Sequence, residues 1–193
     1  MQRRHLILSA AASAAAFALA GCQKQEAEAA APPKALPTPA QAYALAAKGN
    51  GFTIGAVMAA NTVYVFFDTT CPHCAELWNA SKPLLNRLKM VWMPLGLLRP
   101  QSAPQGATIL AAPDPAAAMA ENEAKVLDRS GGITASSSLS DEVLGKVKAN
   151  TEIFNQLGAD SVPLIVFRHA TTGAYGQRAG ALDTAGLAAL VGV

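Results

Sequence analysis

Apolar residues in this chain gather in short runs that are separated by longer stretches with helical spacing. The run at 62–67 (TVYVFF) is β-branched and aromatic, which predicts a buried strand. Residues 90–98 and 162–167 predict two further strands, and shorter strands are expected at 52–55 and 175–179. Strands spread along the chain with helical stretches between them indicate an α/β fold.

A stripe of apolar residues that begins at Cys74 and ends at Leu88 predicts the main helix. We expect this helix to start near Cys71, because Pro72 suits a first turn, where its missing N–H costs nothing. Pro83 should kink its middle. Further helices are expected at 41–47, 106–112, 115–127, 141–157 and 184–191.

The beginning of the chain has the pattern of an export signal. Two arginines precede the uncharged segment 6–20, which is too short to span a bilayer. It ends in Leu-Ala-Gly-Cys at 19–22, which resembles a bacterial lipobox, so residues 1–21 are predicted to be a lipoprotein signal peptide and Cys22 the lipidated residue. An ordinary secretory signal with an accidental cysteine and a twin-arginine signal stay open as alternatives.

Residues 22–40 contain four prolines and no apolar periodicity, which predicts a disordered tether before a folded domain at 41–193. The net charge of +2 comes from the two N-terminal arginines, so the remainder has no electrostatic drive toward nucleic acid. We therefore expect a periplasmic protein that a lipid anchors to a bacterial membrane. Gln23, which replaces the Asp that retains some lipoproteins at the inner membrane, favours the outer one.

Three cysteines are present, and lipidation of Cys22 would leave the pair Cys71 and Cys74. A disulfide that closes so small a loop stabilises a fold only weakly, which favours redox chemistry over a structural bridge. Three residues apart in a helical first turn, the two sulfurs are within reach of a Cys71–Cys74 disulfide. The helix N-terminus lowers the pKa of Cys71, whereas Cys74 lies on the apolar stripe. Cys71 is therefore the expected nucleophile and Cys74 the resolving thiol.

His73 and Pro72 lie between the two cysteines and are expected to tune them. An imidazolium near Cys71 favours the thiolate, and a stabilised dithiol form makes the disulfide a stronger oxidant. A metal site is the alternative, because Cys71, His73 and Cys74 are all possible ligands. A structural zinc site usually needs a fourth ligand, and His169 is expected to be exposed in a polar turn.

Two segments resemble thioredoxin-fold periplasmic disulfide enzymes. Residues 64–74 (YVFFDTTCPHC) resemble the strand-to-helix active site of that family, and 157–167 (LGADSVPLIVF) resemble its segment in which a cis-proline faces the cysteines. With 111–115 (AAPDP), they are similar to the catalytic domain of DsbC and DsbG. The resemblance implies a thioredoxin-like fold with a helical insertion, a cis bond before Pro163, and pairing of an incoming peptide with the backbone of Val162.

The chain departs from DsbC and DsbG in three respects. Too few residues separate Cys22 from the first expected strand to form their dimerisation domain, so we expect a monomer. The dipeptide Pro72-His73 and the residue Val162 resemble the oxidase DsbA instead. The expected function is thiol–disulfide exchange on exported proteins, with an active-site pair that favours oxidation of the substrate. No dissociable cofactor is expected. The resemblance implies a membrane redox partner of the DsbB or DsbD type. A reductase or isomerase, a metal-binding chaperone and a redox-inert binding domain stay open.

Overall fold

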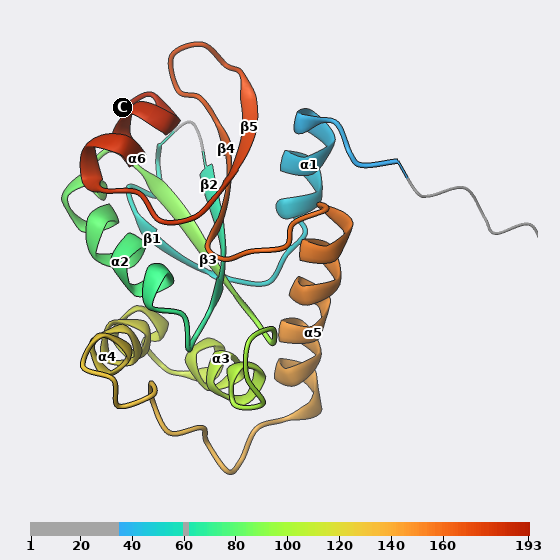
Figure 1. Cartoon of the computed structure of the whole chain (residues 1–193), viewed down its shortest axis with the longest axis vertical. Coiled ribbons are helices and arrows are strands. Elements are labelled where there is room, and N and C mark those ends of the chain that lie inside the picture. The colour runs from blue at the N-terminus through green and yellow to red at the C-terminus, as the bar shows by residue number, and fades with distance from the viewer. Residues whose placement is uncertain (1–34, 60–61) are drawn as a thin grey trace, which may run out of the picture. The chain divides into compact units, whose positions relative to one another are not determined.

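The computed structural model describes residues 35–59 and 62–193, in which five strands form one mixed sheet (Figure 1). The strand order is β1-β3-β2-β4-β5, and β2 runs parallel to β3 while the other neighbours are antiparallel. The bounds are β1 (Phe52–Gly55), β2 (Thr62–Asp68), β3 (Lys89–Leu95), β4 (Leu164–Arg168) and β5 (Tyr175–Ala179). Strands are thus confirmed in all five predicted segments.

Helices cover both faces of this sheet (Figure 1). Helices α1 and α5 lie on one face, α2 and α6 lie on the other, and α3 and α4 lie at the end where β2 passes into α2. The bounds are α1 (Pro39–Ala46), α2 (Pro72–Ser81), α3 (Ser102–Ala111), α4 (Pro115–Leu127), α5 (Asp141–Gln156) and α6 (Thr184–Val191). Three helices therefore separate β3 from β4, which confirms the predicted helical block inside an α/β fold.

The first helix starts earlier than the sequence predicts. Helix α1 begins at Pro39, inside the predicted tether, because Thr38 and Gln41 cap each other. The Gln41 backbone N–H donates to Thr38 Oγ1, and the Gln41 side chain accepts from the Thr38 backbone N–H. The predicted signal peptide at 1–21, the lipidation site at Cys22 and most of the predicted tether lie outside the described residues.

Pro83 ends a helix rather than kinking one, so that prediction is wrong. Helix α2 stops at Ser81, and Pro83 lies in the short 3-10 helix η1 (Lys82–Leu84) that follows. Proline has no N–H to continue the α-helical hydrogen bonds, and its ring crowds the preceding turn. Within the described ranges, no helix combines the length and the apolarity that crossing a bilayer takes.

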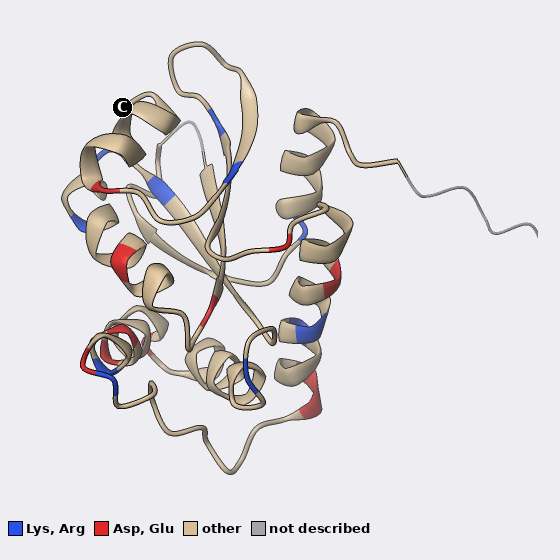
Figure 2. Cartoon of the chain, viewed as in Figure 1, with Lys and Arg blue, Asp and Glu red and all other residues tan. Residues whose placement is uncertain are grey.

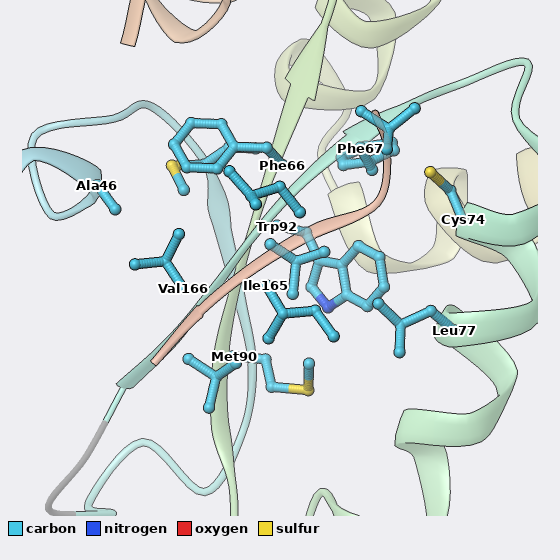
Figure 3. Close-up of a cluster of buried hydrophobic side chains, with 14 of the residues drawn as sticks. Ala46, Phe66, Phe67, Cys74, Leu77, Met90, Trp92, Ile165 and Val166 are labelled. Carbon is cyan, nitrogen blue, oxygen red and sulfur yellow. The ribbon is translucent and has the colours of Figure 1, made fainter. Parts of the chain in front are cut away.

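The centre of the sheet is an apolar cluster (Figure 3). Phe67 from β2, Trp92 from β3 and Ile165 from β4 are fully buried. The Trp92 ring meets Phe67 and Trp78 edge-on, with ring centroids 5.7 and 5.1 Å apart. Burying a large apolar side chain stabilises a fold by about 1.5–3 kcal/mol. The apolar stripe of α2 is therefore core, as predicted, and it fixes the start of that helix against the sheet.

Candidate active site

The two cysteines of the CxxC motif lie where β2 passes into α2. Cys71 is the N-cap of α2, Pro72 occupies its first turn, and Cys74 follows on the face that packs against the sheet. Figure 3 shows the Cys74 side chain pointing toward the apolar cluster. Both cysteines are buried free thiols, so the structure describes the dithiol form of the predicted disulfide pair.

The two thiols differ sharply in acidity. The pKa of Cys71 is lowered to about 6, chiefly because the Cys74 thiol hydrogen-bonds to its sulfur, with help from the backbone N–H groups of Cys74 and His73. Burial raises the pKa of Cys74 well above its usual value. At neutral pH, Cys71 is therefore mostly thiolate while Cys74 keeps its proton. One thiol that attacks and one that stays protonated are the asymmetry that disulfide exchange requires.

His73 is exposed and bonded to Glu76. Its side chain is 68% exposed, and its Nδ1 lies 2.9 Å from Glu76 Oε2. This carboxylate raises the pKa of His73, while the imidazolium charge is the smallest of the influences that lower the pKa of Cys71. The contribution of His73 to the thiolate is thus small beside the hydrogen bond from Cys74.

Val162 and Pro163 lie opposite Cys71. The peptide bond between them is cis, as the resemblance implied, and both side chains are buried. The Cys71 Sγ lies 3.8 Å from the Val162 carbonyl oxygen, although 91 residues separate the two in the sequence. The fold therefore brings together the CxxC motif and the Val-Pro segment that the sequence singled out.

A buried carboxylate beneath the cysteines fixes the active-site loop. Asp68, the last residue of β2, is fully buried. Its Oδ1 accepts hydrogen bonds from the backbone N–H and hydroxyl of Thr70 and from the Ser102 hydroxyl. Its Oδ2 accepts from the backbone N–H groups of Leu97 and Leu98. Asp68 thus ties the loop before Cys71 to the segment between β3 and α3.

Thr69 extends this network toward α3 and α4. Its hydroxyl donates to Gln105 Oε1 at 2.9 Å, and its carbonyl accepts from Asn122 Nδ2 at 2.8 Å. Gln105 Nε2 in turn donates to the carbonyl oxygens of Gly131 and Ile133. The sequence reasoning missed these residues. The one signal that points to them is that Gln105 and Asn122 are polar residues on the buried sides of their helices.

Glu123 in α4 is the unusual acid of this region. It is 1% exposed, and neither carboxyl oxygen has a hydrogen-bond partner among the residues that the structure describes. The pKa of Glu123 is raised to about 9, chiefly by burial, with a smaller contribution from the negative charges of Cys71 and Asp68. With a pKa of about 9, Glu123 is an uncharged acid at neutral pH.

His169 differs from its prediction as a solvent-exposed residue. It is half-buried, and its Nδ1 accepts hydrogen bonds from the backbone N–H groups of Thr171 and Thr172 in the turn between β4 and β5. His169 therefore stabilises this turn. Over residues 35–59 and 62–193, no three His, Cys, Asp or Glu side chains are grouped so that they could share a metal ion.

Comparisons with known proteins agree with this geometry. The family model described as thioredoxin matches residues 47–93. The thiol:disulfide interchange protein DsbG of Escherichia coli is 30% identical over 110 residues, which cover 54% of this chain and 42% of that protein. DsbG of Pseudomonas aeruginosa is 26% identical over 140 residues, which cover 72% of this chain and 54% of that protein.

A solved structure matches as well. The catalytic domain of Proteus mirabilis ScsC superposes with a TM-score of 0.57 at 22% identity, over 77% of this chain and 90% of that one. This similarity concerns the fold. The chain spans about half the length of the curated relatives that it matches. It therefore contains a thioredoxin-like domain with a helical insertion, and its sequence is similar to the thiol:disulfide interchange proteins of the DsbG type.

Proposed function

We propose that this chain is a thiol–disulfide oxidoreductase that acts on exported proteins through Cys71 and Cys74. The observation that carries the proposal is the pair of thiols at the start of α2, one with its pKa lowered to about 6 and one with its pKa raised. The names of the relatives, thiol:disulfide interchange proteins, describe the same chemistry.

The proposed reaction is a pair of exchange steps. In the oxidising direction, a substrate thiolate attacks Cys71 of the Cys71–Cys74 disulfide, the bond between the two cysteines breaks, and Cys74 leaves and takes up a proton. A second substrate thiolate attacks the substrate sulfur of the mixed disulfide, so that Cys71 leaves as thiolate. The substrate gains a disulfide, and two electrons remain on the protein as its dithiol. Reduction of a substrate disulfide runs through the same steps in reverse.

Val162 and Pro163 are proposed to position the substrate. The Val162 carbonyl lies beside the Cys71 sulfur, so an extended peptide that pairs with this backbone would present its own cysteine to the nucleophile. Proline at 163 donates no N–H that could compete for the thiolate.

The low pKa of Cys71 supports the oxidising direction. A stabilised thiolate favours the dithiol form, which makes the disulfide a better oxidant. The dithiol would then need reoxidation by a membrane redox partner of the DsbB type; a DsbD-type partner would instead keep the pair reduced for reductase or isomerase work. The proposed setting is the periplasm, with a monomer that Cys22 anchors to a membrane by its lipid.

The first experiment is the equilibrium reduction potential of the purified full chain against glutathione, together with the oxidative refolding of a reduced substrate protein. A potential near the oxidising end of the span from about −270 to about −120 mV supports a disulfide donor, and one near the reducing end supports a reductase. Cys71→Ser should abolish exchange in either direction, and Cys74→Ser should accumulate the mixed disulfide. Exchange that persists in Cys71→Ser, or stoichiometric zinc or copper bound by the reduced protein, would contradict the proposal.

A further inference from the structure

A recess of about 310 Å³ opens beside the nucleophile. Thr70 and Pro72, which flank Cys71 in the sequence, form one wall of it. Arg99, from the segment between β3 and α3, and Arg129, from the turn that follows α4, form the others. Any group that occupies this recess therefore lies against the two residues that flank the reacting cysteine.

The recess is electropositive. Neither guanidinium group has an ion pair or a hydrogen bond to a side chain or carbonyl in the described part of the chain, and none of the described residues that line the recess is acidic. Two helices also begin at this place, α2 at Pro72 and α3 after its N-cap Gln101, and neither has a side-chain cap. The positive ends of their dipoles add to the charge of Arg99 and Arg129. Figure 2 shows a basic position in each of the two segments that supply the arginines.

The active-site network holds the Arg99 segment in place. The Arg99 backbone N–H donates to Ser102 Oγ at 3.1 Å, and this hydroxyl donates to Asp68 Oδ1 at 2.8 Å. The position of Arg99 is thus coupled to the loop that carries Cys71.

Arg129 is held by its turn. Its φ angle is 67°, in the left-handed region that costs a residue other than glycine about 1–2 kcal/mol. Gly131 lies two residues further on, and its carbonyl accepts from the buried Gln105 side chain. The backbone conformation at position 129 favours glycine or asparagine, yet the chain has an arginine here. Strained positions of this kind are often found at functional sites.

We propose that this recess is a subsite for a peptide carboxylate close to the reacting cysteine of the substrate. Planar guanidinium groups bind carboxylates through paired hydrogen bonds, and two of them around one recess suit a single anionic group. The carboxylate is that of an aspartate or glutamate beside the substrate cysteine, or the terminal carboxylate of a small thiol peptide such as glutathione. The inference rests on the proposed function, because the exchange reaction at Cys71 is what brings a peptide to this place.

The test measures how fast the reduced full chain attacks activated peptide disulfides. Each probe is a short peptide whose cysteine carries a thiopyridyl group, with Asp or Asn beside the cysteine. The Cys71 thiolate attacks the peptide sulfur, the bond to the thiopyridyl group breaks, and pyridinethione is released. Cys74 then displaces the peptide as a thiol. A second pair, glutathione and its glycine monoethyl ester as thiopyridyl disulfides, tests the terminal carboxylate.

Arg99→Gln and Arg129→Asn remove the two charges, and asparagine tolerates the backbone conformation at 129. Arg87→Gln, at an exposed arginine in the turn that follows η1, is the matched control. Relative to wild type and control, the double variant should lose about three- to tenfold in rate on the acidic probe and little on its neutral partner. This loss should shrink as salt is added. Loss on the Asp peptide identifies a side-chain carboxylate, and loss on glutathione alone identifies a terminal one.

Equal rate changes on the acidic and neutral probes, or the same selective loss in Arg87→Gln, would overturn the subsite. Either outcome would leave the proposed function intact as long as the neutral probes react and Cys71→Ser does not. If the neutral probes fail with wild type, the proposed function fails instead.

Discussion

The middle of the sheet and the end of β2 are equally buried but are held together by different forces. In the middle, Phe66, Trp92 and Ile165 are fully buried apolar side chains. At the end of β2, Asp68 and Thr69 are also fully buried, yet they are polar and bonded to several segments. The cysteines lie at the polar end, where β2 passes into α2.

The two regions therefore have different roles: one stabilises the fold, and the other aligns the loops around Cys71. Apolar burial is roughly proportional to area and has no preferred direction, so it tolerates small shifts. Hydrogen bonds to a buried carboxylate are directional and costly to leave unmade, so they fix the loops around Cys71 within narrow limits. The apolar centre accounts for most of the fold's stability, and the polar end accounts for the geometry of the site.

Asp68→Ala should have the largest effect, because it leaves five donors, among them the buried Ser102 hydroxyl, without their acceptor. We expect the free energy of unfolding to fall by about 3–5 kcal/mol, measured by urea denaturation. Asp160→Ala is the control, since Asp160 is exposed and should change stability by no more than about 0.5 kcal/mol. Similar losses in the two variants would mean that the polar end is not held by Asp68.

Glu123→Gln should stabilise the protein in a pH-dependent way. The pKa of Glu123 is about 9 in the folded state against 4.5 as the ordinary value, so the folded state binds its proton more tightly. This contribution to stability is complete below about pH 4.5 and is lost as pH rises toward 9. Glutamine has no such proton to lose. The variant should therefore equal wild type near pH 4 and exceed it by up to about 3 kcal/mol at pH 7.

Urea denaturation at both pH values checks this prediction. Glu152→Gln, at an exposed position of α5, provides the comparison and should show little change at either pH. A difference between Glu123→Gln and wild type that is the same at both pH values would show that the Glu123 proton is not what links pH to stability.

Phe66→Leu tests the apolar side of the comparison. It removes ring volume from a fully buried position and should lower the free energy of unfolding by about 1–2 kcal/mol. The pKa of Cys71, read from the ultraviolet absorbance of the thiolate against pH, should stay near 6 because its hydrogen bonds are untouched. A clear rise of that pKa would mean that core packing also sets the alignment of the site.

His73→Ala should have the smallest effect. The imidazole is exposed and bonded to Glu76, so its removal should raise the pKa of Cys71 by less than about one unit. Cys74→Ala removes the main hydrogen bond to Cys71 and should raise that pKa further. The same absorbance titration compares the two, and a larger shift in His73→Ala would restore the imidazole to the leading role.

Local patterns were enough for much of the fold. The predicted bounds of α4 and α6 agree with the structure, and the five strand segments were found, because amphipathic spacing and β-branched runs reflect contacts between near neighbours. The CxxC motif at a helix start and the burial of Cys74 follow from the same spacing. The prediction for Pro83 is wrong because a continuous apolar stripe does not require a continuous helix: α2 ends at Ser81 and η1 follows.

By itself, then, the sequence determined the strands, the main helices and the two thiols, since each depends on residues a few positions apart. Only the tertiary structure decided what surrounds those thiols. Thr69 bonds to Asn122 across 53 positions, which no local pattern indicates, whereas the approach of Val162 to Cys71 across 91 positions was expected only from the family resemblance. Packing between distant segments also buries Glu123, which keeps it uncharged, and brings Arg99 and Arg129 to the same recess. The protonation and hydrogen bonding of these side chains depend on how deeply they are buried and on which groups they contact. A local sequence pattern encodes neither.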